Sequence, residues 1–250
     1  MIFASVFLYS GQKLHELLHP SVPWEQCLAL WRQRPELCPW QGLHTIASAR
    51  TLDRLVEYVG AGALITKGRS RAAGYFLQSD ADVWLTVDED VRAELATLER
   101  LIARARETRG IVSAPCVLRS DRSEGPQPAK LNVGLAPGLG RLGEDLAELV
   151  RTGMGLVAIH RQAILDVAAR APLVHAEGGA PEYPALFLEE VRDGVWIGED
   201  FAFSDRALAA GVPMHALLDA PTVHARVRGM LRRDLSVVVG WESADAFARE

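Results

Sequence analysis

The stretch Asp80-Ala81-Asp82-Val83-Trp84-Leu85-Thr86-Val87-Asp88-Glu89-Asp90 joins an apolar, β-branched run to three consecutive acids. A run of this kind is typical of a central strand in a parallel sheet, because both faces of such a strand are buried. The acids then lie at the carboxyl end of the strand, where open α/β sheets bind their ligands. The stretch therefore predicts an α/β fold with a mostly parallel central sheet and a ligand site at one edge.

The acids that end this stretch have two interpretations. Side chains alternate along an extended chain, so Asp88 and Asp90 can face one side together. Two adjacent carboxylates repel each other and favour a bound cation, and hard oxygen ligands favour Mg²⁺ or Mn²⁺. In the alternative interpretation, the acids cap the next helix and interact with its dipole.

The composition limits the class of protein. A chain of 250 residues with 49% hydrophobic content can bury one substantial core, and we expect a single domain over residues 1–250. The net charge of −5 does not indicate bulk binding to nucleic acid or anionic membranes. Three cysteines without metal-type spacing fit a reducing cytosol. No stretch has transmembrane length, so we expect a cytoplasmic protein.

Further elements follow from apolar periodicity on either side of the acidic stretch. The predicted strands cover residues 2–9, 43–47, 111–118, 156–159 and 212–218, and the predicted helices cover residues 21–32, 52–59, 66–77, 92–108, 161–170 and 201–210. Residues 121–143 and 175–195 are rich in Gly and Pro or irregular, and we expect flexible loops there.

Two helix starts carry charged residues that invite a functional interpretation. The helix over residues 66–77 begins with Lys67, Arg69 and Arg71, and an anionic ligand such as a diphosphate would relieve their conflict with the helix dipole. A solvated basic face is the alternative. Glu199 and Asp200 open a later helix, either as favourable dipole partners or as a general base.

A second motif points to different chemistry. His15, Glu16 and His19 match the His-Glu-x-x-His pattern of zinc proteases, in which the histidines share one helix face. Pro20 follows at once and biases His19 away from helical geometry, which argues against this interpretation.

Five segments, taken in order, resemble the GT-A fold glycosyltransferases that use nucleotide sugars. They are Gly68-Arg69-Ser70-Arg71 at a helix start, Asp88-Glu89-Asp90 as an Asp-x-Asp motif, Thr152-Gly153-Met154-Gly155 as a glycine-rich acceptor-side strand, Gly198-Glu199-Asp200-Phe201-Ala202-Phe203 as a Glu-Asp helix start, and His224 as a late histidine. The resemblance implies a GT-A type, Rossmann-like α/β/α sandwich. Ser70 departs from the pattern, since many such enzymes have Asn there.

The resemblance implies roles on the donor side of the site. Asp88, Asp90 and His224 would form a site for Mn²⁺ or Mg²⁺, and Asp88 would hold the ribose or bind the metal through water. Arg69 and Tyr9 would contact the nucleotide. The donor would be a nucleoside-diphosphate sugar, most simply a UDP-sugar.

The resemblance also implies roles on the acceptor side. Asp200 would deprotonate the acceptor hydroxyl in an inverting enzyme, with Glu199 beside it, whereas the same acids would serve differently in a retaining enzyme, and the resemblance implies either outcome. Gly153, Met154 and Trp196 would shape the acceptor site. The acceptor stays open between a glycan, a lipid, a protein and a modified nucleic-acid base.

We therefore expect a metal-dependent glycosyltransferase. Residues 1–118 would form its nucleotide-sugar-binding half, and residues 144–230 its acceptor and catalytic half. Two alternatives remain, namely a non-catalytic binding protein with a sugar-nucleotide fold and the zinc protease.

Overall fold

The computed structural model describes residues 1–8, 26, 29, 33–34, 40–61, 64–118, 130–136, 141–175, 182–224 and 227–241. A nine-stranded sheet forms its centre, in the order β2-β1-β3-β9-β5-β14-β8-β6, with β7 also paired to β8. The strands are β1 (Ile2–Leu8), β2 (Leu55–Ala61), β3 (Val83–Asp88), β5 (Ile111–Ser113), β6 (Val133–Leu135), β7 (Arg141–Leu142), β8 (Leu146–Thr152), β9 (Leu156–His160) and β14 (Met214–Leu217).

Most strands of this sheet run in one direction. The pairings β1–β2, β1–β3 and β5–β14 are parallel, whereas β9 and β8 are antiparallel to every strand with which they pair. Only β8 and β9 therefore run against the other strands of this sheet. The predicted class, an α/β/α sandwich around a mostly parallel sheet, is confirmed.

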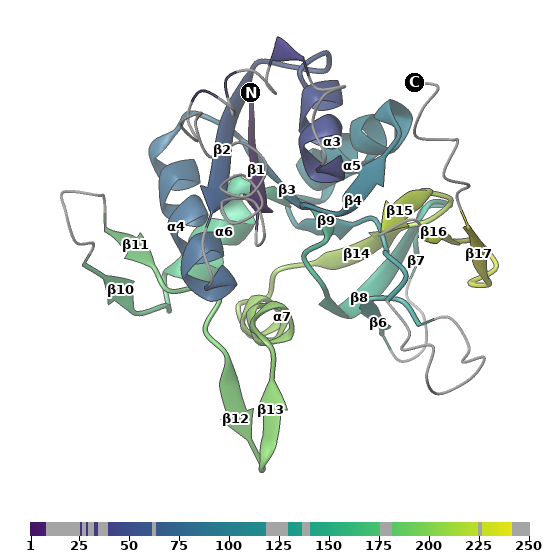
Figure 1. Cartoon of the computed structure of the whole chain (residues 1–250). Helices are drawn as coiled ribbons and strands as arrows, with labels where there is room; N and C mark the ends of the chain where they lie inside the picture. The colour runs from purple at the N-terminus through teal and green to yellow at the C-terminus, as the bar shows by residue number, and fades with distance from the viewer. Residues whose placement is uncertain are drawn as a thin grey trace.

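Helices cover both faces of the sheet (Figure 1). Helices α3 (Gln41–Ala49) and α5 (Leu95–Thr108) lie on one face, and α4 (Ile65–Gln78), α6 (Arg161–Ala168) and α7 (Glu199–Ala209) lie on the other. Strand β3 serves both layers because its side chains alternate: Leu85 packs in the cluster that contains α3 and α5, and Trp84 packs in the opposite cluster. This two-sided burial explains the continuous apolar run that precedes the acids.

An aromatic column anchors α7 to the sheet. The ring centroids of Trp84 and Phe187 are 6.0 Å apart, and those of Phe187 and Phe203 are 4.5 Å apart. The indole N–H of Trp84 donates to Ser5 Oγ at 2.8 Å, so the buried polar atom of the ring is satisfied. Large buried rings of this kind hold α7 against the first half of β3.

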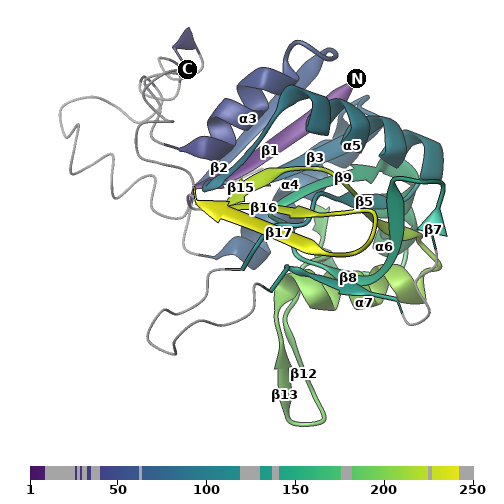
Figure 2. The same ribbon diagram turned by 90° about the vertical axis from the view of Figure 1, so that its right-hand side faces the viewer.

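A second, smaller sheet has the order β17-β16-β15-β4. Its strands are β4 (Val91–Ala93), β15 (Thr222–His224), β16 (Val227–Leu231) and β17 (Val237–Trp241), and Figure 2 shows β15 to β17 side by side. Strand β4 begins one residue after the acidic stretch and pairs antiparallel with β15, in a register that sets Val91 opposite His224. Two short hairpins, β10 (Leu173–Val174) with β11 (Tyr183–Pro184) and β12 (Glu190–Arg192) with β13 (Val195–Ile197), complete the described fold.

Several predicted elements differ from the structure. The strand predicted at residues 43–47 lies within α3, where Gly42, Thr45, Ile46 and Ala49 are buried at helical spacing. The helix predicted at residues 52–59 overlaps β2, all of whose residues pair with β1. The predicted loop at 175–195 contains β11 and most of the β12–β13 hairpin, and the described parts of the predicted loop at 121–143 include β6 and β7.

Most of residues 9–39 lie outside the described residues. Almost all of the helix predicted at residues 21–32 lies outside the described residues, as do His15, Glu16 and His19 of the zinc protease motif. Among the helices in the described ranges, none combines the length and the apolar character needed to cross a bilayer.

Candidate functional site

Arg69 lies at the centre of the candidate site. Arg69 belongs to the second turn of α4, and its side chain is only 3% exposed. The guanidinium donates from Nη2 to Asp88 Oδ1 at 2.6 Å and from Nη1 to Glu199 Oε1 at 2.5 Å. A buried guanidinium is tolerated when carboxylates compensate its charge, and these two bonds provide that compensation.

The bridge joins three elements that are distant in sequence. Asp88 is the last residue of β3, and Glu199 is the first residue of α7. The bonded residues are 19 and 130 positions from Arg69 along the chain. Two of the predicted site residues on the donor side and one on the catalytic side therefore meet at the carboxyl end of β3.

Asp90 and His224 form a second pair beside this bridge. His224 Nε2 lies 3.5 Å from Asp90 Oδ2, and His224 Nδ1 lies 2.7 Å from the Val117 carbonyl oxygen. A carbonyl can only accept, so Nδ1 carries the proton. In the neutral ring, Nε2 then presents a lone pair toward a carboxylate. A shared proton or a metal ion would satisfy this arrangement, and a backbone carbonyl on the other nitrogen is the usual support of a metal-binding histidine.

The predicted three-residue metal set is not gathered. Within the ranges listed for the fold, no three or more His, Cys, Asp or Glu side chains are grouped so that they could hold a metal ion. Asp88 is bonded to Arg69, whereas Asp90 faces His224. The donor set of one carboxylate oxygen and one imidazole nitrogen fits a divalent ion that takes its other ligands from water or a phosphate.

Helix α3 holds the acidic stretch in place, which the sequence did not predict. The Gly42 N–H donates to the Glu89 carbonyl at 3.0 Å, and a Cβ at Gly42 would lie 2.5 Å from the Asp88 carbonyl oxygen. Thr45 Oγ1 donates to the Val91 carbonyl at 3.1 Å. The signal available in the sequence was Gly42 itself, because a glycine at a helix start often marks a close backbone approach.

The glycine-rich segment packs against β3 and a nearby asparagine. The Asp88 N–H donates to the Gly155 carbonyl at 2.9 Å, and a Cβ at Gly153 would lie 2.8 Å from Asn132 Nδ2. Met154 is 1% exposed and belongs to the core cluster. Gly153 and Gly155 therefore allow the backbone of this segment to approach its neighbours closely.

Asp200, the second residue of α7, has a perturbed carboxyl group. Burial raises the pKa of its carboxyl group above the usual value, and the neighbouring Glu199 charge raises it further, while Arg69 acts in the opposite direction. Its Oδ1 accepts the Phe201 N–H at 2.7 Å. Farther along α7, the Thr152 N–H donates to Ser204 Oγ at 3.0 Å, which ties the helix to β8. A carboxylate with a raised pKa binds a proton more readily at neutral pH.

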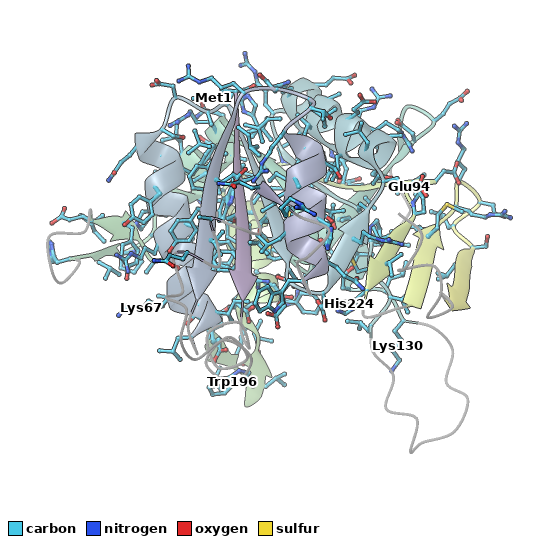
Figure 3. All side chains as sticks on the ribbon, turned by 45° about the horizontal axis from the view of Figure 1, so that its top comes forward. Met1, Lys67, Glu94, Lys130, Trp196 and His224 are labelled. Atoms are coloured by element: carbon cyan, nitrogen blue, oxygen red, sulfur yellow. The ribbon has the colours of Figure 1, made fainter. Side chains whose placement is uncertain are left out.

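Of the remaining predicted site residues, the structure describes Trp196 but not Tyr9. Figure 3 places Lys67, Trp196 and His224 toward the same end of the molecule, opposite Met1. Trp196 lies on β13 and is 67% exposed. Tyr9, the predicted nucleotide contact on the first strand, lies outside the described residues.

No protein-family model and no curated protein matches this sequence. Among solved structures, the chain is similar to the crystal structure of A197 from STIV, with a TM-score of 0.50 and 14% identity over 97% of this chain and 96% of that one. It is also similar to GalNAc-T7 with UDP, GalNAc and Mn²⁺ (TM-score 0.48, 11% identity, 90% of this chain and 43% of that one). A third similar structure is apo-UDP-glucose pyrophosphorylase (TM-score 0.42, 8% identity, 90% and 76%). The likeness to A197 extends over nearly the whole of both chains and shows a shared fold.

Proposed function

We propose that this protein is a glycosyltransferase that moves a sugar from a nucleoside-diphosphate sugar, a UDP-sugar in the simplest case, to a hydroxyl acceptor in the presence of Mn²⁺ or Mg²⁺. The observation that carries the proposal is the buried Arg69 bridge. It joins the Asp-x-Asp strand end at Asp88 to the Glu-Asp helix start at Glu199. Sugar-nucleotide chemistry needs a donor site and an acceptor base at one edge, and the bridge holds the two segments together.

The charges of the site argue for a cation during donor binding. Among the residues that the structure describes, the Arg69 guanidinium bonds to Asp88 and Glu199, and the carboxyl groups of Asp90 and Asp200 add further negative charge beside them. Arg69 already compensates two of these groups, so it adds little positive charge for a diphosphate. An anionic donor approaching such a site needs a divalent ion to offset the repulsion.

Asp90 and His224 are the residues that would hold this ion, with Asp88 acting through water. When bound, a divalent cation neutralises the charge that develops on the leaving diphosphate. The chain's own residues perform the other tasks. Val117 orients His224, Gly42 holds the acidic stretch, and Arg69 fixes Asp88 at the strand end.

Asp200 is the proposed base of an inverting reaction. The acceptor oxygen forms a bond to the anomeric carbon while the bond from that carbon to the diphosphate oxygen breaks. The diphosphate leaves with the electron pair, and the acceptor proton passes to the Asp200 carboxylate. Glu199 is a positioning residue in this scheme, because its bond to Arg69 fixes the first turn of α7.

Calorimetric titration with UDP, with and without Mn²⁺, tests the donor site. We expect binding only with Mn²⁺, and we expect Asp90→Ala to abolish it. Asp80→Ala is the matched control, since Asp80 is an exposed acid that precedes β3 at the opposite end of that strand. If UDP and a panel of nucleotide sugars give no heat with Mn²⁺, the proposal is wrong.

Slow release of UDP from a donor sugar tests catalysis separately. A glycosyltransferase transfers the sugar to water at a low rate when the acceptor is missing. Mn²⁺-dependent UDP binding without any such release, across donors that bind, would instead identify a non-catalytic binding protein.

A further inference from the structure

Asn132, the residue directly before β6, lies between two segments of the candidate site. Its N–H donates to the Cys116 carbonyl at 2.9 Å, and the next residue along each chain, Leu131 and Val117, form an antiparallel bridge. The Asn132 carbonyl accepts the Gly153 N–H at 2.6 Å. The backbone of Asn132 therefore joins the extended segment at Cys116 to the glycine-rich segment.

The Asn132 side chain binds the same two segments a second time. Its Oδ1 accepts the Cys116 N–H at 2.8 Å. An N–H can only donate, so this bond assigns the oxygen and the nitrogen of the amide. A Cβ at Gly153 would lie 2.8 Å from Nδ2, and one at Gly155 would lie 3.5 Å from it. The two glycines therefore leave the space that the Asn132 amide occupies.

One of these segments sets the protonation of His224. Val117 follows Cys116, and its carbonyl accepts the proton of His224 Nδ1 at 2.7 Å. In the neutral ring, this bond leaves Nε2 without a proton, 3.5 Å from Asp90 Oδ2. A shift of the Val117 carbonyl would therefore change which ring nitrogen carries the proton and which can bind an ion.

The other segment supports the acidic end of β3. The Asp88 N–H donates to the Gly155 carbonyl at 2.9 Å. Because Gly153 and Gly155 both approach the Asn132 amide, that amide sets how closely the glycine-rich segment packs. Asn132 therefore contacts both the segment that is bonded to Asp88 and the segment that is bonded to His224.

We propose that Asn132 is a positioning residue of the candidate ion site, an inference that rests on the proposed function where it concerns Mn²⁺. By binding the Cys116 N–H, its side-chain oxygen fixes the neighbouring Val117 carbonyl and, through it, the Nδ1–H tautomer of His224. Without this acceptor, the Cys116 N–H loses its partner, and the segment is no longer held in register with His224. Groups that orient a metal-binding histidine change metal affinity by about 10- to 100-fold when they are replaced.

Long-range correlation spectra of the histidine ring nitrogens test the tautomer without any metal. We expect His224, identified by the signal that His224→Gln removes, to carry its proton on Nδ1 in the wild type. Asn132→Ala should shift it toward the Nε2–H form, because the Val117 carbonyl is no longer held in place. Asn132→Asp keeps an acceptor oxygen for the Cys116 N–H and should retain the Nδ1–H form.

Two glycine substitutions test the same contact while the amide stays in the chain. The Cβ introduced by Gly153→Ala would lie 2.8 Å from Asn132 Nδ2, so the amide or the segment must move, and we expect the same change at His224. Gly134→Ala is the matched control on β6. Its Cβ would lie 3.4 Å from the Val150 side chain, an ordinary packing distance, and the His224 signal should stay as in the wild type.

Electron paramagnetic resonance of free Mn²⁺ measures the affinity for the ion alone. We expect Asn132→Ala and Gly153→Ala to weaken Mn²⁺ binding about tenfold. Ser79→Ala is the control for a general loss of stability, because Ser79 Oγ also accepts one backbone N–H, that of Ala81 at 3.3 Å. Ser79 precedes β3, at the end of that strand opposite Asp88, and its replacement should leave Mn²⁺ affinity unchanged.

The outcomes separate this inference from the proposed function. An unchanged His224 tautomer and unchanged Mn²⁺ affinity in Asn132→Ala, even with lower stability, overturn the inference alone. A wild-type His224 that carries its proton on Nε2 also overturns it. A tautomer that depends on Asn132, in a wild-type protein that binds neither Mn²⁺ nor UDP, supports the positioning of His224 and overturns the ion site of the proposed transferase.

Discussion

Arg69 and Asp200 respond in different ways to burial. The Arg69 guanidinium is compensated by two carboxylates at hydrogen-bonding distance. Asp200 has no comparable ion pair in the part of the chain that the structure describes, and burial raises the pKa of its carboxyl group. A carboxylate that compensates a buried guanidinium gains stability from that partner, whereas the proposed base, Asp200, lacks such a partner among the described residues.

Replacing Asp200 by Asn should therefore affect activity and stability in opposite directions. Removing a general base lowers kcat by about 10²- to 10⁴-fold. The raised pKa means that the folded protein binds this proton more tightly than the unfolded chain, so ionised Asp200 costs stability at neutral pH. We expect Asp200→Asn to raise the free energy of unfolding at pH 7, measured by urea denaturation. In the wild type, kcat should fall as the pH decreases through the raised pKa.

Asp205 lies on the same helix, and its substitution is the control, because it should change the free energy of unfolding in the opposite direction. Burial alone would raise the pKa of its carboxyl group, but the bonds to Arg151 and Arg192 lower it. Asp205→Asn should therefore destabilise the protein at pH 7. Equal effects of the two substitutions on unfolding would contradict the assignment of Asp200 as a buried, unpaired base.

At the scale of elements, long and strongly periodic segments were predictable from the sequence. The helix at residues 66–77 and the strand at 83–87 lie close to the observed α4 and β3. The sequence predicted a strand at residues 43–47, where α3 lies, and a helix at residues 52–59, which β2 overlaps. Both segments are short, and the apolar pattern of each fits a helix as well as a strand. The pairing of β4 with β15 could not be predicted, because it depends on register between segments more than 120 residues apart.

For the candidate site, the sequence likewise predicted several of the residues but not the contacts between them. The sequence indicated Arg69, Asp88, Glu199 and Asp200 because each follows a strand or opens a helix. It did not show that Arg69 bonds to two acids rather than to a ligand, since side-chain partners depend on tertiary packing. Val117, which orients His224, carries no sequence signal, because it acts through its backbone carbonyl.

One side chain from another helix adds donors at the end of α4, where Ser79 Oγ also donates to the Phe76 carbonyl at 2.7 Å. The last carbonyls of a helix lack intrahelical donors. Arg161, the first residue of α6, donates to the Phe76 carbonyl at 3.0 Å, to the Leu77 carbonyl at 3.1 Å and to the Ala81 carbonyl at 2.8 Å, and it also bonds to the Ser79 carbonyl. Its guanidinium also lies 4.9 Å from the Phe76 ring centroid.

Removing this side chain should loosen α4 and the approach to β3. We expect Arg161→Met to lower the free energy of unfolding by about 3 kcal/mol, because several partly buried carbonyls lose a charged donor at once. Urea denaturation measures the change. Arg170→Met is the matched control, since exposed Arg170 donates to a single carbonyl among the described residues, that of Ala209, and its cost should stay below about 1 kcal/mol. Similar costs for the two variants would show that Arg161 does not act as the cap of α4.

At the scale of the whole molecule, the sheet contains a histidine that should set the response of stability to mild acid. His215 lies on β14, between β5 and β8, and is 8% exposed. Its Nδ1 atom is buried and has no hydrogen-bond partner among the described residues. Burial lowers the pKa of its imidazole, and Glu148 on the neighbouring strand opposes this only in part.

The sign of the effect follows from proton binding. Above pH about 6.5, the imidazole is neutral in the folded and unfolded chains, so it gives no pH dependence. As the pH falls below this value, the unfolded chain takes up the proton first, and the folded state loses stability until the pH reaches the lowered pKa. His160, whose pKa burial also lowers, contributes in the same direction. Protonation of Asp200 contributes in the opposite direction.

We therefore expect His215→Phe to flatten the dependence of the unfolding free energy on pH between about 7 and 5, relative to wild type. Urea denaturation at a series of pH values measures this slope. The substitution also changes packing, which can alter the unfolding free energy at pH 7. The slope of that free energy against pH is therefore the quantity that measures proton uptake by His215. If His215→Phe and the wild type lose stability in parallel as the pH falls, His215 does not take up the proton, and the acid response of this fold must come from its other titratable groups.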